Sequence, residues 1–203
     1  MSRVGRLNAE ETPRGQVTKA ALIGAARELF VSKGYFATGT EEIVAKANVG
    51  TRGALYHHFA DKEDLFRAVF DQVQADLAAA TTVNERDDAL ELLTAALQQF
   101  LDASADNADV QQILLIDGPA VLGWDRWRSL EADYGLGVIM AMLNAAVTQK
   151  VIPRQPTGPL AHMLLAAVDE AALYIANAPD RRLAHKEARQ SLMRLLGGLR
   201  AIP

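Results

Sequence analysis

The segment TRGALYHHFADK, residues 51–62, brings two cations, two adjacent histidines and two further aromatic side chains into twelve positions. Such residues suit a metal centre, a catalytic cluster or a surface that meets a negatively charged partner. His57 and His58 are adjacent, so on a helix they point about 100° apart and do not share a metal as an i, i+4 pair does. A zinc site also needs several converging ligands. The segment therefore does not favour a metal site.

Catalysis is not favoured either. A nucleophile needs a neighbouring base and an orienting group, but Thr51 and His57 lie on poorly matched faces of one short helix. The chain has no cysteine, which excludes thiolate nucleophiles, disulfides and cysteine-based zinc sites. No glycine-rich phosphate loop or nucleophile elbow occurs. We expect neither an enzyme nor a bound metal or cofactor.

The elements around the segment predict a helix-turn-helix. Apolar residues at helical spacing indicate a first helix from residue 17 that ends at Gly34. A short second helix follows, with Thr38 or Thr40 as its N-cap and Asn48 at its end. The turn NVGT then leads into a third helix opened by Thr51. In this arrangement the last helix enters the DNA major groove.

The residue types of the third helix suit DNA. Arg52 can bond guanine or hold a phosphate. Gly53 allows the helix to approach the DNA backbone closely, and the Tyr56 hydroxyl can donate to a phosphate. Lys62 lies in the first turn of a fourth helix capped by Asp61, where a cation suits an anion-binding site. An ordinary solvated lysine is the alternative.

Residues 18–66 resemble the DNA-binding domain of TetR-family transcriptional repressors. The resemblance rests on AARELFVSKGYFATGTEEIVAKANVGTRGALYHHFADKEDLF, and above all on GALYHHFADKEDL. It implies a homodimer that binds a palindromic operator, and a ligand-binding body that lowers the affinity for DNA. Carried over by position, the family's phosphate and base contacts fall on Thr40, Thr51, Arg52, Gly53, Tyr56, His57 and Lys62.

Two departures from the family pattern concern this surface. Four steps, where the family usually has three, separate Val49 from Gly53, which makes Gly50 an extra turn residue. Glu41 and Glu42 stand near the start of the second helix, where they suit the helix dipole but repel phosphates. The alternative function is therefore a helical small-molecule-binding protein or enzyme whose helix-turn-helix no longer reads DNA.

The remaining sequence predicts an all-α fold of about nine helices. We expect a flexible arm at residues 1–16, a helix-turn-helix domain at 17–62, and a ligand-binding and dimerisation domain at 63–203. Asn84 is the expected cap of one long helix, Gly118 and Pro119 are expected to end another, and residues 151–159 form a proline-rich break. No window shows strand alternation.

Composition and charge limit the setting. Half of the 203 residues are apolar and the net charge is -4. Residues 1–70 hold 10 Lys and Arg against 8 Asp and Glu, whereas residues 71–203 hold 11 against 17, so the two parts differ in sign. No apolar run approaches the roughly 20 residues of a membrane span, and the N-terminus lacks a secretory core. We expect a cytoplasmic protein without a membrane partner.

The second domain carries the predicted homodimer interface and ligand pocket. Apolar stripes on residues 158–177 and 180–199 suit a four-helix dimer interface, as the resemblance implies, or an internal core. An unidentified small molecule is expected between the middle helices, although aromatic and methionine residues at helical spacing equally suit plain core. The candidate lining residues are Phe100, Leu114, Trp124, Trp127, Tyr134, Met140 and His162.

Three acidic residues stand within apolar runs: Asp117, Asp169 and Glu170. A buried carboxylate is costly unless it is paired. Asp169 or Glu170 is expected to meet an arginine such as Arg126 or Arg128, or else to await a cationic or hydroxylated ligand.

Overall fold

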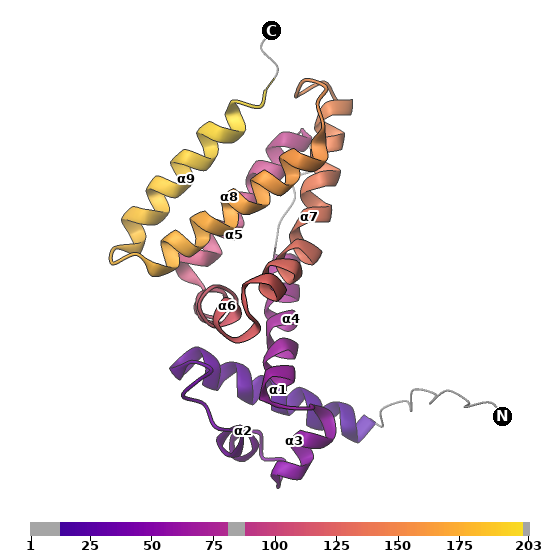
Figure 1. Cartoon of the computed structure of the whole chain (residues 1–203), viewed down its shortest axis with the longest axis vertical. Helices are drawn as coiled ribbons and strands as arrows, with labels where there is room; N and C mark the ends of the chain where they lie inside the picture. Colours follow the sequence, from indigo (N-terminus) through magenta and orange to yellow (C-terminus); the bar gives the residue numbers. More distant parts are fainter. Residues whose placement is uncertain (1–12, 81–87, 201–203) are drawn as a thin grey trace, which may run out of the picture. The chain divides into compact units, whose positions relative to one another are not determined.

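The computed structural model describes residues 13–80 and 88–200. The chain separates into two compact units, residues 1–69 and 70–203. Throughout the described ranges the regular structure is helical, with nine α-helices and one π-helical segment (Figure 1). The predicted all-α fold is confirmed.

The first unit is a small helical cluster around an apolar core. It contains α1 (Pro13–Lys33), α2 (Thr40–Ala47), α3 (Arg52–His58) and the first part of α4 (Lys62–Ala80). Helix α1 contacts both α2 and α3, and α2 contacts α3 (Figure 1). The largest fully buried side chains of this core are Leu22, Phe30, Ile43, Leu55, Leu65 and Phe66.

Helix α1 begins earlier than the sequence indicated. Residues 13–16, expected in the flexible arm, are helical. Pro13 suits the first turn because the missing N–H has no helical partner there. The rest of the expected arm, residues 1–12, lies outside the described residues.

Gly34 ends α1 as expected, with φ +82°, and its N–H donates to the Phe30 carbonyl over 2.7 Å. The predicted threonine caps of α2 are wrong. The N-cap is Gly39, and no side chain caps the helix. The buried Thr38 hydroxyl instead donates to the Gly34 carbonyl over 2.8 Å. Thr38 thus closes the connection between α1 and α2 rather than starting α2.

The turn between α2 and α3 contains two residues with positive φ. Asn48, the expected helix end, has φ +54° and Gly50 has φ +88°. Thr51 returns to an extended backbone and is the N-cap of α3, as predicted. The next helix start is also confirmed, since Asp61 Oδ1 accepts from the Asp64 N–H over 2.8 Å.

The second unit is built from longer helices. After α4 come α5 (Ala89–Asp106), the π-helical segment η1 (Val110–Asp117), α6 (Gly118–Leu122), α7 (Trp124–Thr148), α8 (Thr157–Asn177) and α9 (Arg181–Gly197). Helices α5, α7 and α8 contact one another, and α9 packs on α5 and α8 (Figure 1). The expected end at Gly118 and Pro119 is wrong, because the chain passes there from η1 directly into α6.

Helix α5 begins at Ala89, and a reciprocal capping box fixes its start. Asp88 Oδ1 accepts from the Glu91 N–H over 2.8 Å, and Glu91 Oε2 accepts from the Asp88 N–H over 3.3 Å. The expected cap, Asn84, lies outside the described residues. Each acid therefore accepts from a backbone N–H that has no partner within the helix.

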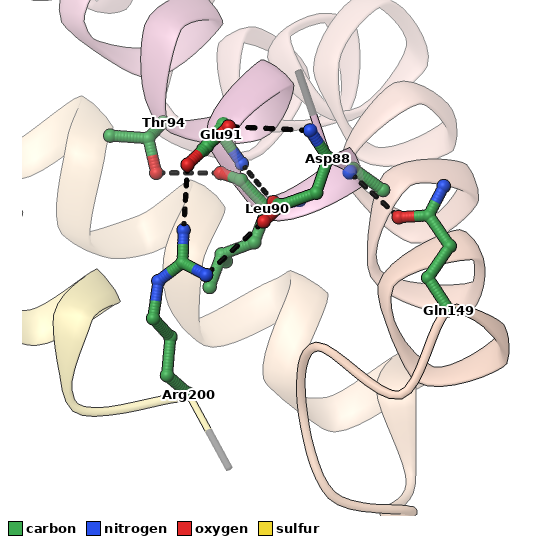
Figure 2. Close-up of polar contacts among 7 residues, drawn as sticks. Asp88, Leu90, Glu91, Thr94, Gln149 and Arg200 are labelled. Atoms are coloured by element: carbon green, nitrogen blue, oxygen red, sulfur yellow. Dashed lines mark hydrogen bonds and ion pairs between the residues drawn. The ribbon is translucent and has the colours of Figure 1, made fainter. Parts of the chain in front are cut away.

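Two distant segments attach to this capping box (Figure 2). Arg200, which follows α9, pairs with Asp88 over 3.1 Å and with Glu91 over 3.2 Å. Gln149, at the end of α7, accepts from the Ala89 N–H over 2.9 Å. One helix start therefore holds the ends of two other helices of the second unit.

Helices α7 and α8 are long and apolar enough, averaged over 18 residues, to cross a membrane by composition alone. A search for apolar runs does not detect this property, because it appears only in the average over 18 residues. Core helices of soluble proteins meet the same criterion, and here α7 and α8 pack against each other.

Candidate nucleic-acid interface and apolar cavity

Helix α3 presents one face to the core and the other outward. Leu55 and Phe59 are buried. The outward residues follow from the helical period, since positions between the buried ones point away from the core. The exposed side comprises Thr51, Arg52, Gly53, Tyr56 and His57, five of the seven predicted DNA contacts.

Side chains of α2 and α3 meet in a polar group that we term the Arg52 cluster: Thr40, Glu41, Arg52 and Tyr56. Arg52 Nη1 donates to Glu41 Oε1 over 2.9 Å, and Nη2 donates to the Tyr56 hydroxyl over 3.4 Å. Hydrogen bonds from Arg52 and then Thr40 lower the pKa of Tyr56. Thr40, half-buried at the start of α2, thus lies beside the exposed face of α3.

Lys62, the seventh predicted contact, has partners within the first unit. Its Nζ donates to the carbonyls of Tyr35 and Thr38, each over 2.8 Å, and lies 3.9 Å from the centre of the Tyr35 ring. The lysine therefore ties the start of α4 to the connection between α1 and α2. No sequence pattern indicates this role, because the acceptors are backbone carbonyls far away in the chain.

Gly53 is not required by internal packing. A Cβ atom there would approach only Thr51 Oγ1, at 3.5 Å, which is an ordinary contact. A glycine within a helix lowers its stability by about 1 kcal/mol relative to alanine. The space beside Gly53 is therefore open to an external partner.

His57 and His58 stack edge to face, with ring centres 5.1 Å apart. Over residues 13–80 and 88–200, no group of three or more His, Asp or Glu side chains converges on a common point. The two histidines thus form an aromatic pair at the end of α3.

The second unit contains a cavity of about 310 Å³ between α4, α5, α7 and α8. Its polar members are Gln74, Glu131, Tyr134 and Asp169. The remaining wall is almost entirely apolar and is formed by Leu77, Ala78, Leu93, Ala96, Leu97, Phe100, Gly135, Val138, Ile139, Met142, Leu165 and Val168.

Of the predicted pocket residues, Phe100 and Tyr134 line this cavity. Trp127 is fully buried elsewhere in the core, where its Nε1–H donates to the Leu114 carbonyl over 2.8 Å. The other four lie off the cavity wall: Leu114 is buried in the core, Trp124 and His162 are exposed, and Met140 is half-buried.

Two carboxyl groups, Glu131 and Asp169, border the cavity, and we term them the carboxyl pair. Glu131 Oε1 accepts from Gln74 Nε2 over 2.8 Å, and Arg128 pairs with Asp169. Burial, assisted by the charge of Asp169, raises the pKa of Glu131 to about 8. Burial also raises the pKa of Asp169, opposed by Arg128, to about 6. At pH 7 Glu131 is mostly neutral and Asp169 mostly ionised.

The pairing of Asp169 with Arg128 was anticipated from the sequence, whereas Glu131 was missed. A signal for Glu131 was present. It lies four positions after Trp127 and eight before Ile139, both of which are buried, so it falls on the inward stripe of α7.

Two family descriptions match the chain. Residues 22–69 match "Bacterial regulatory proteins, tetR family", and residues 90–199 match "Tetracyclin repressor-like, C-terminal domain". The transcriptional regulator SrpR of Pseudomonas putida is 33% identical over 159 residues, which cover 75% of this chain and 69% of SrpR. The Transposon Tn10 TetC protein of Escherichia coli is 29% identical over 153 residues, covering 72% and 74% of the two chains.

A solved structure agrees over nearly the whole length. A TetR-family transcriptional regulator from Pectobacterium atrosepticum superposes with a TM-score of 0.81 at 30% identity, covering 98% of this chain and 100% of that one. The similarity therefore includes both the helix-turn-helix and the helical body. The chain belongs to the TetR family of transcriptional regulators, a soluble and non-enzymatic family with a DNA-binding helix-turn-helix.

Proposed function

We propose that the chain is a cytoplasmic, ligand-responsive transcriptional repressor that binds a palindromic operator as a homodimer and is released by a small molecule. The observation that carries the DNA-binding part is the outward face of α3, where Arg52, Gly53 and Tyr56 lie exposed on a helix whose other side is core. Family membership supplies the expectation of DNA binding.

On this proposal the seven predicted contact residues divide by task. Thr40, Tyr56 and Lys62 hold phosphates, and the groove-facing group is Thr51, Arg52, Gly53 and His57. Phosphate contacts fix the register of the helix, whereas contacts to base edges give specificity. Lys62 already donates to the carbonyls of Tyr35 and Thr38. It can therefore bind a phosphate with its third N–H, or by giving up one of these carbonyls.

The homodimer is proposed to form through residues 158–177 and 180–199. Large apolar side chains are exposed on α8 and α9, and a continuous apolar surface typically marks an interface. Two-fold dimers bury the same patch on both copies. The exposed apolar residues on these helices are Met163, Tyr174, Leu183, Met193 and Leu195.

The ligand part rests on the cavity of the second unit. Family members bind small ligands, and a largely apolar cavity with a few polar groups is the usual form of a small-molecule site. A ligand that prefers the non-binding arrangement of the dimer shifts the population away from DNA. A 100-fold loss of DNA affinity corresponds to about 2.7 kcal/mol of differential binding.

A gel-shift assay with the duplex upstream of the protein's own gene tests DNA binding. We expect a specific shift at moderate salt that Arg52→Ala and Tyr56→Ala each weaken about 10-fold or more. Arg154→Ala is the matched control, because it removes one exposed cation from the second unit. If both α3 variants bind like wild type, the assigned recognition surface is wrong. If the wild type gives no specific shift, a binding protein with an inactive helix-turn-helix becomes the better account.

Light scattering of the purified chain tests the dimer. We expect twice the chain mass of 22.0 kDa. A charge placed within a buried apolar interface is strongly unfavourable, so Tyr174→Glu and Leu195→Glu should yield monomers. Val17→Glu is the control, since Val17 is also apolar and 69% exposed but lies on α1. Dimers that persist in both α8 and α9 variants argue for another interface.

A further inference from the structure

We infer that the cavity of the second unit takes a lipophilic cation, a largely hydrophobic molecule whose single protonated amine binds the carboxyl pair, with Glu131 as its direct partner. The inference rests on the proposed function in that it treats the cavity as the effector site. It goes further by assigning the chemical class of the effector and the residue that selects it.

The geometry leaves one oxygen of Glu131 available. Gln74 Nε2 donates to Oε1, and this is the hydrogen bond that Glu131 makes within the described chain. No fully buried side-chain nitrogen or oxygen of the described residues lacks a partner. Oε2 therefore borders open space rather than packed protein, and Glu131 lines the cavity. An occupant can reach it from the cavity.

The charges around Glu131 favour a cation. Asp169 on α8 is a second carboxyl group on the same wall, and Arg128 on α7 can offset only one of the two once Glu131 also ionises. Helix α4 contributes the amide of Gln74 and also Asp71, which accepts from the Tyr134 hydroxyl over 3.2 Å. The wall that α5 provides is apolar: Leu93, Ala96, Leu97 and Phe100.

Anions and uncharged ligands fit these groups less well. An anionic ligand gains no ion pair, because Arg128 already pairs with Asp169, and it keeps Glu131 protonated. An alcohol can hydrogen-bond Glu131 but leaves the acid neutral and gains no ion pair. An ammonium group both donates to Oε2 and allows Glu131 to ionise beside a cation, which gives the stronger, charge-assisted bond.

Binding of an amine has a proton balance that can be measured. Glu131 is mostly neutral at pH 7, because burial raises its pKa to about 8. A bound ammonium lowers that pKa, so the acid releases its proton to solvent and the amine keeps its own, since alkyl ammonium groups titrate near 10.4. Amine affinity should rise with pH until about 8, where free Glu131 is already ionised.

Three probes with one carbon skeleton test the selectivity: 4-phenylbutylamine, 4-phenylbutan-1-ol and 4-phenylbutyrate. Calorimetry with the full chain should rank them amine, alcohol, carboxylate, with about 10-fold between amine and alcohol. Amine titrations at pH 7 in two buffers of different ionisation enthalpy should show up to about one proton released per site.

The decisive variant is Glu131→Gln, which retains an oxygen acceptor for Gln74 but cannot ionise. We expect about 10-fold weaker amine binding, nearly unchanged alcohol binding and no proton release. Asp133→Asn is the matched control, because Asp133 is an exposed acid on the same helix. Thermal unfolding of both variants verifies that they are folded.

Three outcomes overturn the inference: no amine binding, equal binding of the three probes, or amine binding that Glu131→Gln leaves unchanged. Because calorimetry needs no DNA, it separates this inference from the proposed function. Glu131-dependent amine binding that does not release operator DNA leaves the cavity assignment standing and contradicts ligand-responsive repression. Operator binding combined with probe binding that does not depend on Glu131 contradicts this inference and leaves the DNA-binding part of the proposed function standing.

Discussion

Glu131 is an acid in a largely apolar setting, and this makes the stability of the second unit depend on pH. Its ordinary pKa of 4.5 rises to about 8 in the folded chain. Below pH 4.5 both the folded and unfolded states hold the proton. Between pH 4.5 and 8 the unfolded chain releases it while the folded chain retains it, so the contribution of Glu131 to stability falls as the pH rises.

Glu131→Gln should therefore stabilise the protein more at pH 8 than at pH 5. Each pKa unit corresponds to about 1.4 kcal/mol, and with partial relaxation of the site we expect a difference of about 2 kcal/mol between the two pH values. Urea unfolding of wild type, Glu131→Gln and the control Asp133→Asn measures it. An effect of Glu131→Gln that is the same at both pH values would show that Glu131 titrates normally.

Asp169 depends on Arg128, which holds the pKa of this buried carboxyl below the value that burial alone would give. Arg128→Met leaves a buried carboxylate without its cation, and because the arginine is 31% exposed we expect a loss of about 2 kcal/mol at pH 7. The loss should shrink at pH 5, where Asp169 is protonated. Adding Asp169→Leu to Arg128→Met should restore most of the stability. Urea unfolding tests both variants, and a double variant as unstable as the single one contradicts the pairing argument.

At the scale of elements, the turn before α3 depends on its extra glycine. Gly50 has φ +88°, and a Cβ there would meet no atom within 4 Å. The cost of Gly50→Ala is therefore backbone strain alone, about 1 kcal/mol. Gly39→Ala is the control, because its site is equally open but its φ is -89°. Equal melting temperatures for the two variants would show that the turn adapts without strain.

Gly53 separates helix stability from DNA recognition. Gly53→Ala should stabilise α3 by up to about 1 kcal/mol, since the new methyl group has room and alanine favours helix. The same methyl group should weaken operator binding, because it keeps the helix from the DNA backbone. Thermal unfolding and gel shift on one preparation measure both effects. A variant that is more stable and binds DNA equally well removes Gly53 from the interface.

The elements that the sequence predicted correctly depend on local signals. Gly34, Asn48 and Asp61 act through their own backbone or the next turn. The Thr38 cap failed because the Thr38 hydroxyl donates to the carbonyl of Gly34, and Thr40 is already the first residue of α2. Neighbouring positions on a helix do not reveal such competition.

The cavity was harder to predict because its walls come from four helices. Trp127 is an aromatic residue of the kind that lines pockets, but its indole N–H donates to the Leu114 carbonyl within the π-helical segment η1. A π-helix shifts every following side chain relative to an α-helical reading. Helical spacing alone therefore cannot tell which aromatic residues of this region face the cavity.

At the scale of the whole molecule, a chain of net charge -4 is proposed to bind a polyanion through a small part of its surface. Binding should then fall as salt rises, by about one unit of log–log slope for each phosphate contact. The ion pair between Arg52 and Glu41 weakens the attraction of Arg52 for a phosphate, because the phosphate and the carboxylate compete for one guanidinium.

Glu41→Gln should strengthen binding several-fold to operator and unrelated duplex alike, because it frees Arg52 and removes a charge that repels phosphates. Arg52→Ala distinguishes the two tasks of the arginine. Loss on both duplexes with a slope lower by about one per contact indicates a phosphate contact, whereas loss on the operator alone indicates base readout. Affinities measured across a KCl series decide between them. If Glu41→Gln weakens operator binding instead, the carboxylate orients Arg52 for its base rather than competing with DNA.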